Sequence, residues 1–153
     1  MLKVLDGKKF LDIYEPTRLD SKITMKEKLD TMALYVKEGK LGGLGISAVT
    51  ADQMKEAASL HPIAAVEVEL SLQSPDISTN GVTSTCAELH VLVVAYSPLG
   101  RGLLTAAITK PGDLDPSEIR HHLPRFAPSN IQKDVLMGNE VQKMAKAKGC
   151  TPA

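Results

Sequence analysis

The feature that most constrains the fold of this chain is a regular alternation of short apolar runs with amphipathic segments of helical period. Four apolar runs predict strands, and helical patterns separate each strand from the next. Such alternation favours a parallel sheet whose strands are joined by right-handed helical crossovers. The predicted strands cover residues 10–14, 41–47, 64–70 and 91–96.

Capping boxes mark the starts of three helices, because in each box a Thr or Ser is followed three residues later by Glu or Gln. A fourth helix is predicted after Asn80, with Val82, Cys86 and Leu89 on one inward face. Residues 101–129 carry four prolines and predict a long, irregular connection. The capping boxes are Thr24–Glu27, Thr50–Gln53 and Ser129–Gln132, and the last helix is expected to run to about Lys148.

Two architectures fit this alternation, an open doubly wound sheet and a piece of a (β/α) barrel. An open sheet that binds a dinucleotide needs a glycine-rich turn between its first strand and first helix, which this sequence lacks. In a barrel, function lies at the carboxyl ends of the strands. We therefore predict an α/β fold, an incomplete (β/α)8 TIM barrel with about four β/α units and parallel strands. The apolar run 91–96 is expected to be covered on both faces.

Composition excludes several classes of function. Eighteen Lys and Arg residues balance eighteen Asp and Glu residues, so the charge predicts neither a nucleic acid nor a membrane partner. No apolar run is long enough for a membrane span, and no signal-peptide pattern follows Met1. Cys86 and Cys150 lie far apart in the sequence, which favours a reduced, cytoplasmic protein over a disulfide scaffold.

Three short motifs give only weak indications of a site. Residues 42–45 (GGLG) lie within or before a predicted strand, so backbone packing is favoured over a phosphate-binding loop. His121 and His122 are neighbours in a loop without the spacing of a helical metal pair, so no metal site is predicted. Glu67 and Glu69 share one strand face and could do acid–base work as in glycosidases, but no sugar-binding aromatic residues flank them.

The stretch VVAYSPLGRGLL, residues 93–104, carries the clearest candidate site. Its apolar strand ends on Tyr96 and continues into a glycine-bearing turn. A tyrosine ring there can stack on a flat ligand, while Ser97 and the N–H groups of the turn can bind phosphate oxygens. Arg101 can add positive charge. From the residues alone, a binding role and an ordinary strand cap are both open.

Longer stretches resemble one enzyme family. AVEVELSL, CAELHVLVVAYSPLGRGLLT and HHLPRFAPSN are similar to the aldo-keto reductases, and HPIAAVEVELSL with DISTNGV is closest to their pyridoxal reductase-like branch. The resemblance covers residues 10–153 in unbroken order. It implies a TIM barrel that binds NADPH without a Rossmann fold and reduces a small carbonyl substrate, in this branch pyridoxal to pyridoxine.

The same resemblance implies cofactor roles for individual residues. Tyr96 would stack against the nicotinamide ring, and Ser47 would hydrogen-bond the nicotinamide carboxamide. Glu67 stands where many relatives have a glutamine, and a carboxylate accepts a hydrogen bond from the amide but donates none. Ala48 occupies a position where relatives often have a polar partner of the carboxamide, and its methyl side chain can form no hydrogen bond. The pyrophosphate side would be held by Ser97, Leu99, Gly100 and Arg101.

The resemblance also implies what this chain lacks for catalysis. In the family a tyrosine protonates the developing alkoxide, a lysine paired with an aspartate lowers the pKa of that tyrosine, and a histidine orients the substrate. The tyrosine, lysine and aspartate belong to strands before those predicted here, and Thr17 stands at the histidine position. We therefore expect no catalytic residue in residues 1–153, which would form a partial domain of a longer reductase, lacking the first strands and the last strand and inactive by itself.

A non-catalytic half-barrel module is the alternative interpretation. It would leave two exposed sheet edges and an inward face without the strands that fill a complete barrel. An apolar surface of that kind is usually covered by another chain. Such a module would act by self-association, with two half-barrels closing on each other, or by binding a partner.

Overall fold

The computed structural model describes residues 2–18 and 22–153, which fold into two compact units. The first unit comprises Met1–Leu70 and Pro75–Tyr96, and the second comprises Ser71–Ser74 and Ser97–Ala153. Each unit has its own hydrophobic core.

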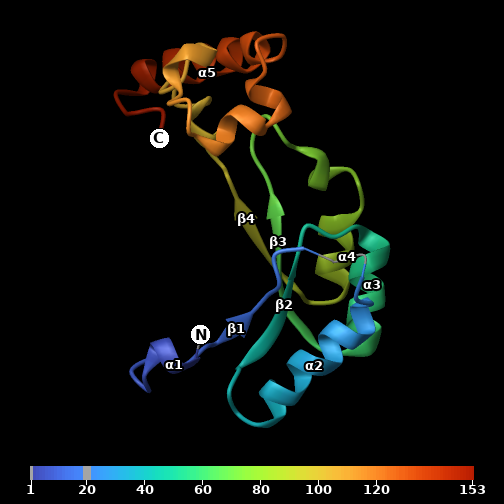
Figure 1. The fold of residues 1–153 in the computed structure, drawn as a ribbon. Coiled ribbons are helices and arrows are strands. Elements are labelled where there is room, and N and C mark those ends of the chain that lie inside the picture. The colour runs from blue at the N-terminus through green and yellow to red at the C-terminus, as the bar shows by residue number, and fades with distance from the viewer. Residues whose placement is uncertain (1, 19–21) are drawn as a thin grey trace. The chain divides into compact units, whose positions relative to one another are not determined.

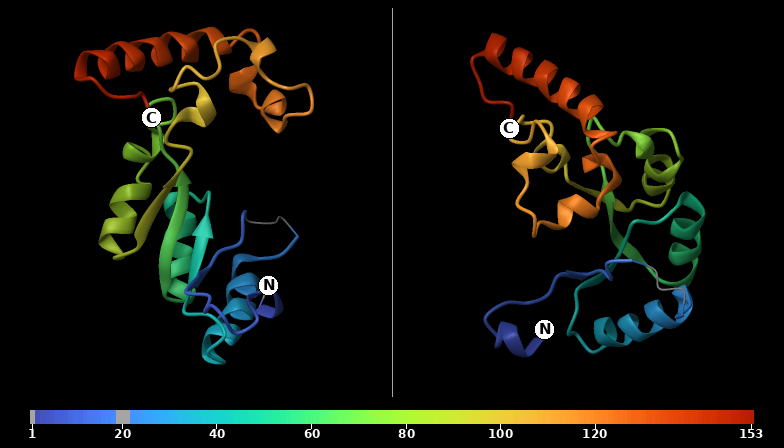
Figure 2. Two further views of the ribbon diagram at one scale, coloured as in Figure 1. Left: turned by 90° about the vertical axis from the view of Figure 1, so that its left-hand side faces the viewer. Right: turned by 45° about the horizontal axis from the view of Figure 1, so that its top comes forward.

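The first unit contains a four-stranded parallel sheet in the order β1-β2-β3-β4 (Figure 1). Its three longer helices lie on one face of the sheet (Figure 2). The predicted parallel α/β fold and its four strands are confirmed, although β1 is only two residues long. The strands are β1 (Ile13–Tyr14), β2 (Gly43–Ser47), β3 (Ile63–Glu69) and β4 (Leu92–Tyr96), and the helices are α1 (Leu2–Leu5), α2 (Met25–Lys37), α3 (Ala51–Leu60) and α4 (Val82–Glu88).

Two of the three predicted capping boxes form. In α2 the Glu27 N–H donates to Thr24 Oγ1 at 3.2 Å, and the Thr24 N–H donates back to Glu27 Oε2 at 3.0 Å. Thr50 and Gln53 make the equivalent pair at the start of α3. These bonds satisfy backbone N–H groups that the first helical turn leaves without partners.

The third predicted capping box is wrong. Helix α5 (Ile131–Lys148) begins after Asn130, and no side chain caps its first turn. The Asn130 amide instead donates to the carbonyl oxygen of Pro124 at 2.8 Å, which ties the start of α5 to the preceding loop. The predicted end of this helix is confirmed, because Gly149 follows it in the left-handed conformation (φ +67°).

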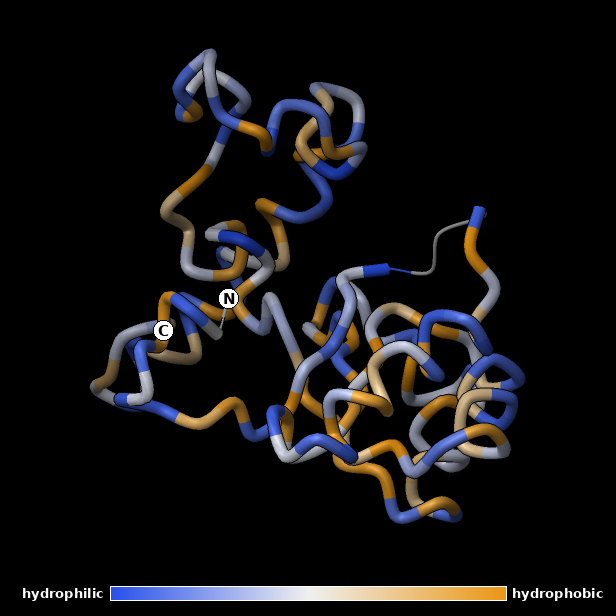
Figure 3. Tube along the Cα trace, turned by 60° about the horizontal axis from the view of Figure 1, so that its bottom comes forward, coloured by the Kyte–Doolittle hydropathy of each residue, from blue (hydrophilic) through white to orange (hydrophobic). Residues whose placement is uncertain are grey.

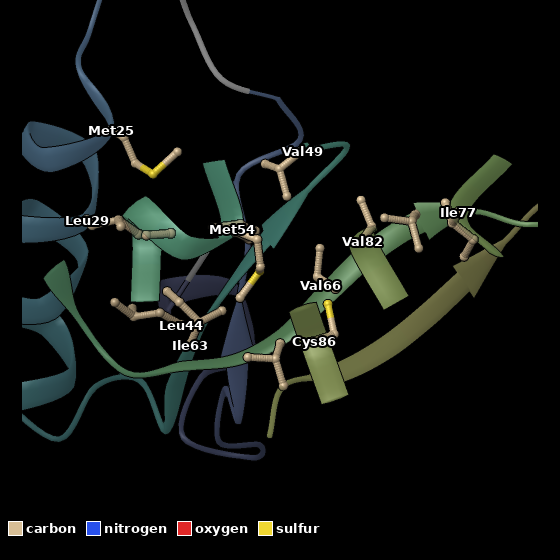
Figure 4. Packing of buried hydrophobic residues seen from close by; sticks show 14 of the residues in the cluster. Met25, Leu29, Leu44, Val49, Met54, Ile63, Val66, Ile77, Val82 and Cys86 are labelled. Carbon is tan, nitrogen blue, oxygen red and sulfur yellow. The ribbon is translucent and has the colours of Figure 1, made fainter. Parts of the chain in front are cut away.

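The core of the first unit lies between the sheet and its helices (Figure 4). Leu29 of α2, Met54 of α3 and Cys86 of α4 pack there with Val66 of β3, and none is more than 1% exposed. Along the trace the helical segments alternate hydrophobic and hydrophilic residues, as expected for helices with one buried side (Figure 3). Burial raises the pKa of the Cys86 thiol, which fits a structural residue.

Strand β4 is not covered on both faces, contrary to the prediction. Val93 packs against the core, whereas Leu92 and Val94 are 62% and 39% exposed. The reason is that successive strand residues point to opposite faces, and the helices of this unit cover one face only. Leu89 is also more exposed than predicted, at 38%, because α4 ends at Glu88 and Leu89 leaves its inward face.

The second unit consists of the short segment Ser71–Ser74, a loop with several short 3-10 turns, and α5. Leu103, Ile108 and Phe126 form its core with Ile131 of α5. The predicted irregular connection is confirmed, with turns at Gly100–Gly102, Pro111–Asp113, Ile119–His122 and Pro124–Phe126. Within the described residues, no helix combines the length and apolar character needed to cross a membrane.

Candidate functional site

Three of the residues assigned to the cofactor lie on one face of the sheet in the first unit. Ser47 of β2 pairs with Glu67 of β3, and Glu69 pairs with Tyr96 of β4. Paired residues of parallel strands point the same way, and so do residues two apart in one strand. All four side chains therefore project from the face opposite the helices, near the carboxyl ends of their strands.

The surroundings of these residues are partly enclosed. Ser47 is 7% exposed, while Glu67 and Tyr96 are half-buried. Ala48 follows β2 with a positive φ of +54°, and its N–H donates to the carbonyl oxygen of Glu67 at 2.9 Å. The backbone at residue 48 thus holds the end of β2 against β3, and its methyl side chain offers no hydrogen bond to a ligand.

A side chain that the sequence did not assign, Glu15, reaches this face from the end of β1. Its Oε2 lies over Gly45 of β2, where an added Cβ atom would approach to 2.6 Å. Glu15 Oε2 is buried without a hydrogen-bond partner, so the other carboxyl oxygen of Glu15 is the one available for a hydrogen bond with the Glu67 carboxyl on β3. Burial, the charge of Glu67 and that hydrogen bond together raise the pKa of Glu15 above its ordinary range.

The turn after Tyr96 belongs to the second unit and has an unusual backbone. Ser97, Gly100, Arg101 and Gly102 have φ values of +54°, +59°, +56° and +102°. Non-glycine residues rarely take such values, and they cluster at sites where the surroundings impose them. The Gly100 N–H donates to the Ser97 carbonyl oxygen at 3.0 Å, which closes the first part of the turn.

Buried polar atoms without partners surround Gly100 in the second unit. Among the described residues, both amide atoms of Gln73 and the Nε of Arg101 are buried without a hydrogen-bond partner. A Cβ atom at Gly100 would come within 2.1 Å of Gln73 Oε1, so the Gln73 amide lies directly against Gly100. Buried donors of this kind normally have acceptors. The Gln73 amide nitrogen and the Arg101 Nε are therefore donors without acceptors among the described residues.

The turn is held in place from the rest of the second unit. Arg120 Nη1 donates to the carbonyl oxygen of Arg101 at 2.9 Å, and Arg120 is itself paired with Glu118. Helix α5 packs against the same segment at Gly138, where an added Cβ atom would lie 2.2 Å from the carbonyl oxygen of Leu103. Leu99, also assigned to the pyrophosphate, is 42% exposed on this turn.

Thr17, at the expected histidine position, follows β1 and is exposed. Leu19 and Asp20, the last residues of the stretch that carries this assignment, lie outside the described residues. Tyr14 packs against the core, and Tyr35 is 44% exposed on α2.

His61 and His121 each contact an oxygen atom of another residue. His61 Nε2 lies 2.8 Å from Asp30 Oδ1 and links the end of α3 to α2. His121 Nε2 lies 3.0 Å from the carbonyl oxygen of Asp115. In the part of the chain that the structure describes, no group of three metal-binding side chains is assembled.

A cavity of about 830 Å³ lies elsewhere in the first unit, between the N-terminal segment and α2. Its apolar lining includes Leu11, Ile23 and Met32, and three lysines contribute to its lining. It shares no lining residue with the sheet face that carries Ser47, Glu67 and Tyr96. The volume of this cavity therefore gives no support to the assigned site, which rests on strand register and side-chain chemistry.

Glu15 and Gln73 are not among the site residues predicted from the sequence. Glu15 follows a predicted strand directly, so the rule that barrel ligands meet the carboxyl ends of strands could have selected it. Gln73 lies in a turn closed by reciprocal hydrogen bonds between Ser71 and Ser74. Its position beside Gly100, 27 residues further along the sequence, has no sequence signal.

Comparisons with known proteins identify relatives along the entire sequence. The family model described as Aldo/keto reductase family matches residues 1–153. The aldo-keto reductase str7 of Strobilurus tenacellus is 35% identical in an alignment over 147 residues, and the match covers 93% of this chain and 43% of that protein. The chain thus spans less than half the length of this relative.

Solved structures share the fold. The glycerol dehydrogenase AKR11B4 from Gluconobacter oxydans superposes with a TM-score of 0.80 at 24% identity, over 94% of this chain and 43% of that one. The thermostable aldo-keto reductase Tm1743, solved with the inhibitor epalrestat, gives a TM-score of 0.70 at 25% identity, over 99% of this chain and 45% of that one. The parallel strands described above therefore correspond to a part of the (β/α)8 barrel of these proteins, and the chain belongs to the aldo/keto reductase family of oxidoreductases.

Proposed function

We propose that this chain carries cofactor-binding strands of a cytoplasmic, NADPH-dependent carbonyl reductase of the pyridoxal reductase-like type. The observation that supports this proposal is the placement of Ser47, Glu67 and Tyr96 on one face at the carboxyl ends of neighbouring parallel strands. Barrel enzymes bind their ligands at these strand ends. The free thiols of Cys86 and Cys150 fit a reducing compartment.

In this proposal, residues of this chain bind and orient the nicotinamide end of the cofactor. A bound dinucleotide would supply the hydride for the carbonyl carbon of pyridoxal. Because we expect no catalytic acid in residues 1–153, the proton for the carbonyl oxygen would come from a longer reductase. The Tyr96 ring packs on the flat nicotinamide, the Ser47 hydroxyl hydrogen-bonds its carboxamide, and Glu67 accepts from the amide N–H.

The turn after β4 would bind the pyrophosphate of the dinucleotide. Its backbone N–H groups and the Arg101 guanidinium are donors suited to phosphate oxygens. The buried, unpartnered Nε of Arg101 and the Gln73 amide beside Gly100 support this role.

In a complete barrel, replacing Tyr96 with alanine is expected to weaken NADPH binding by about 1–3 kcal/mol, because both aromatic stacking and apolar burial are lost. Tyr96→Phe keeps the ring and is expected to bind almost as well as the wild type. Titration of the protein with NADPH, followed by the fluorescence of the cofactor, measures both variants. Equal losses in the two would assign the effect to the hydroxyl group and contradict stacking.

Self-association of the half-barrel is the second candidate function. Ile13, Leu92 and Val94 project from the sheet face opposite the helices and are 39%, 62% and 39% exposed. A second copy of the chain would cover these three apolar side chains and pair the exposed edge of β4.

Size-exclusion chromatography with light scattering tests this second function, and a dimer or insoluble material is the expected result. Replacing Val94 with lysine places a charge on the face and is expected to shift a dimer toward monomer. Ala87→Lys, an exposed change on α4 that adds the same single charge, serves as a control for added charge alone. A wild-type monomer that unfolds cooperatively on heating would contradict self-association.

A further inference from the structure

The side chain of Glu15 crosses a strand to meet Glu67. Glu15 follows β1, Glu67 lies on β3, and β2 runs between them. Neighbouring strands are about 4.8 Å apart, so the two backbones are separated by two such spacings. The crossing is possible because Gly45 has no side chain: an added Cβ atom there would lie 2.6 Å from Glu15 Oε2 and 3.0 Å from Glu15 Cβ.

Two carboxyl groups can share a hydrogen bond only when one of them carries a proton, because ionised carboxylates are acceptors only. The pair lies on a partly buried face where ionising both groups costs free energy. Ser47 on β2, Glu69 on β3 and Tyr96 on β4 are the polar groups that share this face. Burial and Glu67 raise the pKa of Glu15, and no salt bridge to Glu15 is present among the described residues.

We propose that Glu15 and Glu67 share one proton and that Glu15 thereby acts as a positioning residue, holding Glu67 as a hydrogen-bond acceptor for the amide group of a bound dinucleotide. This inference rests on the proposed function. With one shared proton the pair carries a single negative charge, and the remaining oxygen of Glu67 is free to accept from an amide N–H. When both groups ionise they repel each other, and this orientation of Glu67 is lost.

The direction of the pH dependence follows from the raised pKa of Glu15. The shared proton is held at a pH below the raised value and is lost as the pH rises through it, whereas in strong acid both carboxyl groups are protonated and the pair is neutral. Dinucleotide affinity is therefore expected to fall as the pH rises through that window. Loss of one hydrogen bond predicts a decrease of about tenfold.

Nuclear magnetic resonance of the side-chain carboxyl carbons tests the shared proton without any cofactor. In the wild-type chain the Glu15 carbon is expected to titrate above the ordinary range. In Glu67→Gln its titration is expected to move down, because the like charge is removed and an amide N–H becomes available as a donor. Glu69→Gln, on the same face and strand, is the matched control and is expected to leave the Glu15 titration raised. An ordinary titration of Glu15 in the wild type would overturn the inference.

NADPH titrations across the same pH range test the positioning role. Glu15→Gln keeps a donor to Glu67 at every pH, so its affinity is expected to stay at the low-pH level of the wild type. Glu15→Ala has no donor and is expected to bind about tenfold more weakly at low pH, with little pH dependence. Backbone amide spectra confirm that each variant is folded.

The results separate the two proposals. A raised titration of Glu15, with pH-dependent binding in the wild type and pH-independent binding in Glu15→Gln, supports the positioning role. Equal pH dependence in the wild type and in Glu15→Gln overturns it. A raised titration without NADPH binding in any protein, wild type included, overturns the proposed function and, with it, the role of the pair toward a dinucleotide.

Discussion

Replacing Met54 with alanine is expected to lower the free energy of unfolding of the first unit by about 2–5 kcal/mol. Met54 lies on the inward side of α3 and is completely buried between that helix and the sheet. The alanine side chain would leave a cavity that the surrounding residues fill only in part. The atoms that line the unfilled part of this cavity also lose dispersion contacts.

Urea denaturation followed by far-ultraviolet circular dichroism measures this loss in a chain without tryptophan. Met144→Ala is the matched control, because Met144 is 55% exposed on α5 and its replacement is expected to change stability by no more than about 0.5 kcal/mol. If the two variants unfolded at the same urea concentration, Met54 would not be part of the core described above.

Replacing Gly138 with alanine is expected to destabilise the second unit by about 1–3 kcal/mol, the usual cost of overpacking. On helix propensity alone the same change would stabilise α5 by up to about 1 kcal/mol. The sign is reversed because the new Cβ atom would lie 2.2 Å from the carbonyl oxygen of Leu103, a backbone atom that cannot move aside like a side chain. Helix α5 must then shift away from the turn that carries Arg101.

Gly112→Ala is the control for this prediction. Gly112 has no neighbouring atom within 4 Å of an added Cβ and does not have a positive φ. Its replacement is expected to be neutral or stabilising by about 0.4–1 kcal/mol. Thermal unfolding of both variants measures the difference, and a Gly138→Ala protein as stable as the wild type would show that α5 does not pack on Leu103.

The two carboxyl groups on the sheet face alter what the family resemblance implies for Glu67. A carboxylate in place of an amide loses one donor. The structure adds Glu15 as a neighbour of Glu67, so the chemistry of this position depends on a pair of residues and on pH. In the proposed reductase, the affinity for the nicotinamide end of the cofactor would therefore respond to acidity.

Local rules account for what the sequence predicted correctly. The capping boxes at Thr24 and Thr50 join residues three positions apart, so the sequence alone determines them. The alternation of strands and helices likewise follows from periods of two and 3.6 residues. The box at Ser129 does not form because α5 begins one residue later, with Asn130 at the N-cap position, and the Ser129 hydroxyl donates to Asn130 Oδ1 instead.

The sequence by itself determined the family, the order of strands and helices, and the placement of Ser47, Glu67 and Tyr96 near strand ends. The tertiary structure decided which groups meet those residues. Strand β2 lies between the strands that carry Glu15 and Glu67. Glu15 can reach Glu67 across β2 because Gly45 of that strand has no side chain. Gln73 lies against Gly100 because packing within the second unit brings the two turns together. Sequence periodicity specifies the face on which a side chain lies, whereas contacts between distant segments depend on strand order and packing.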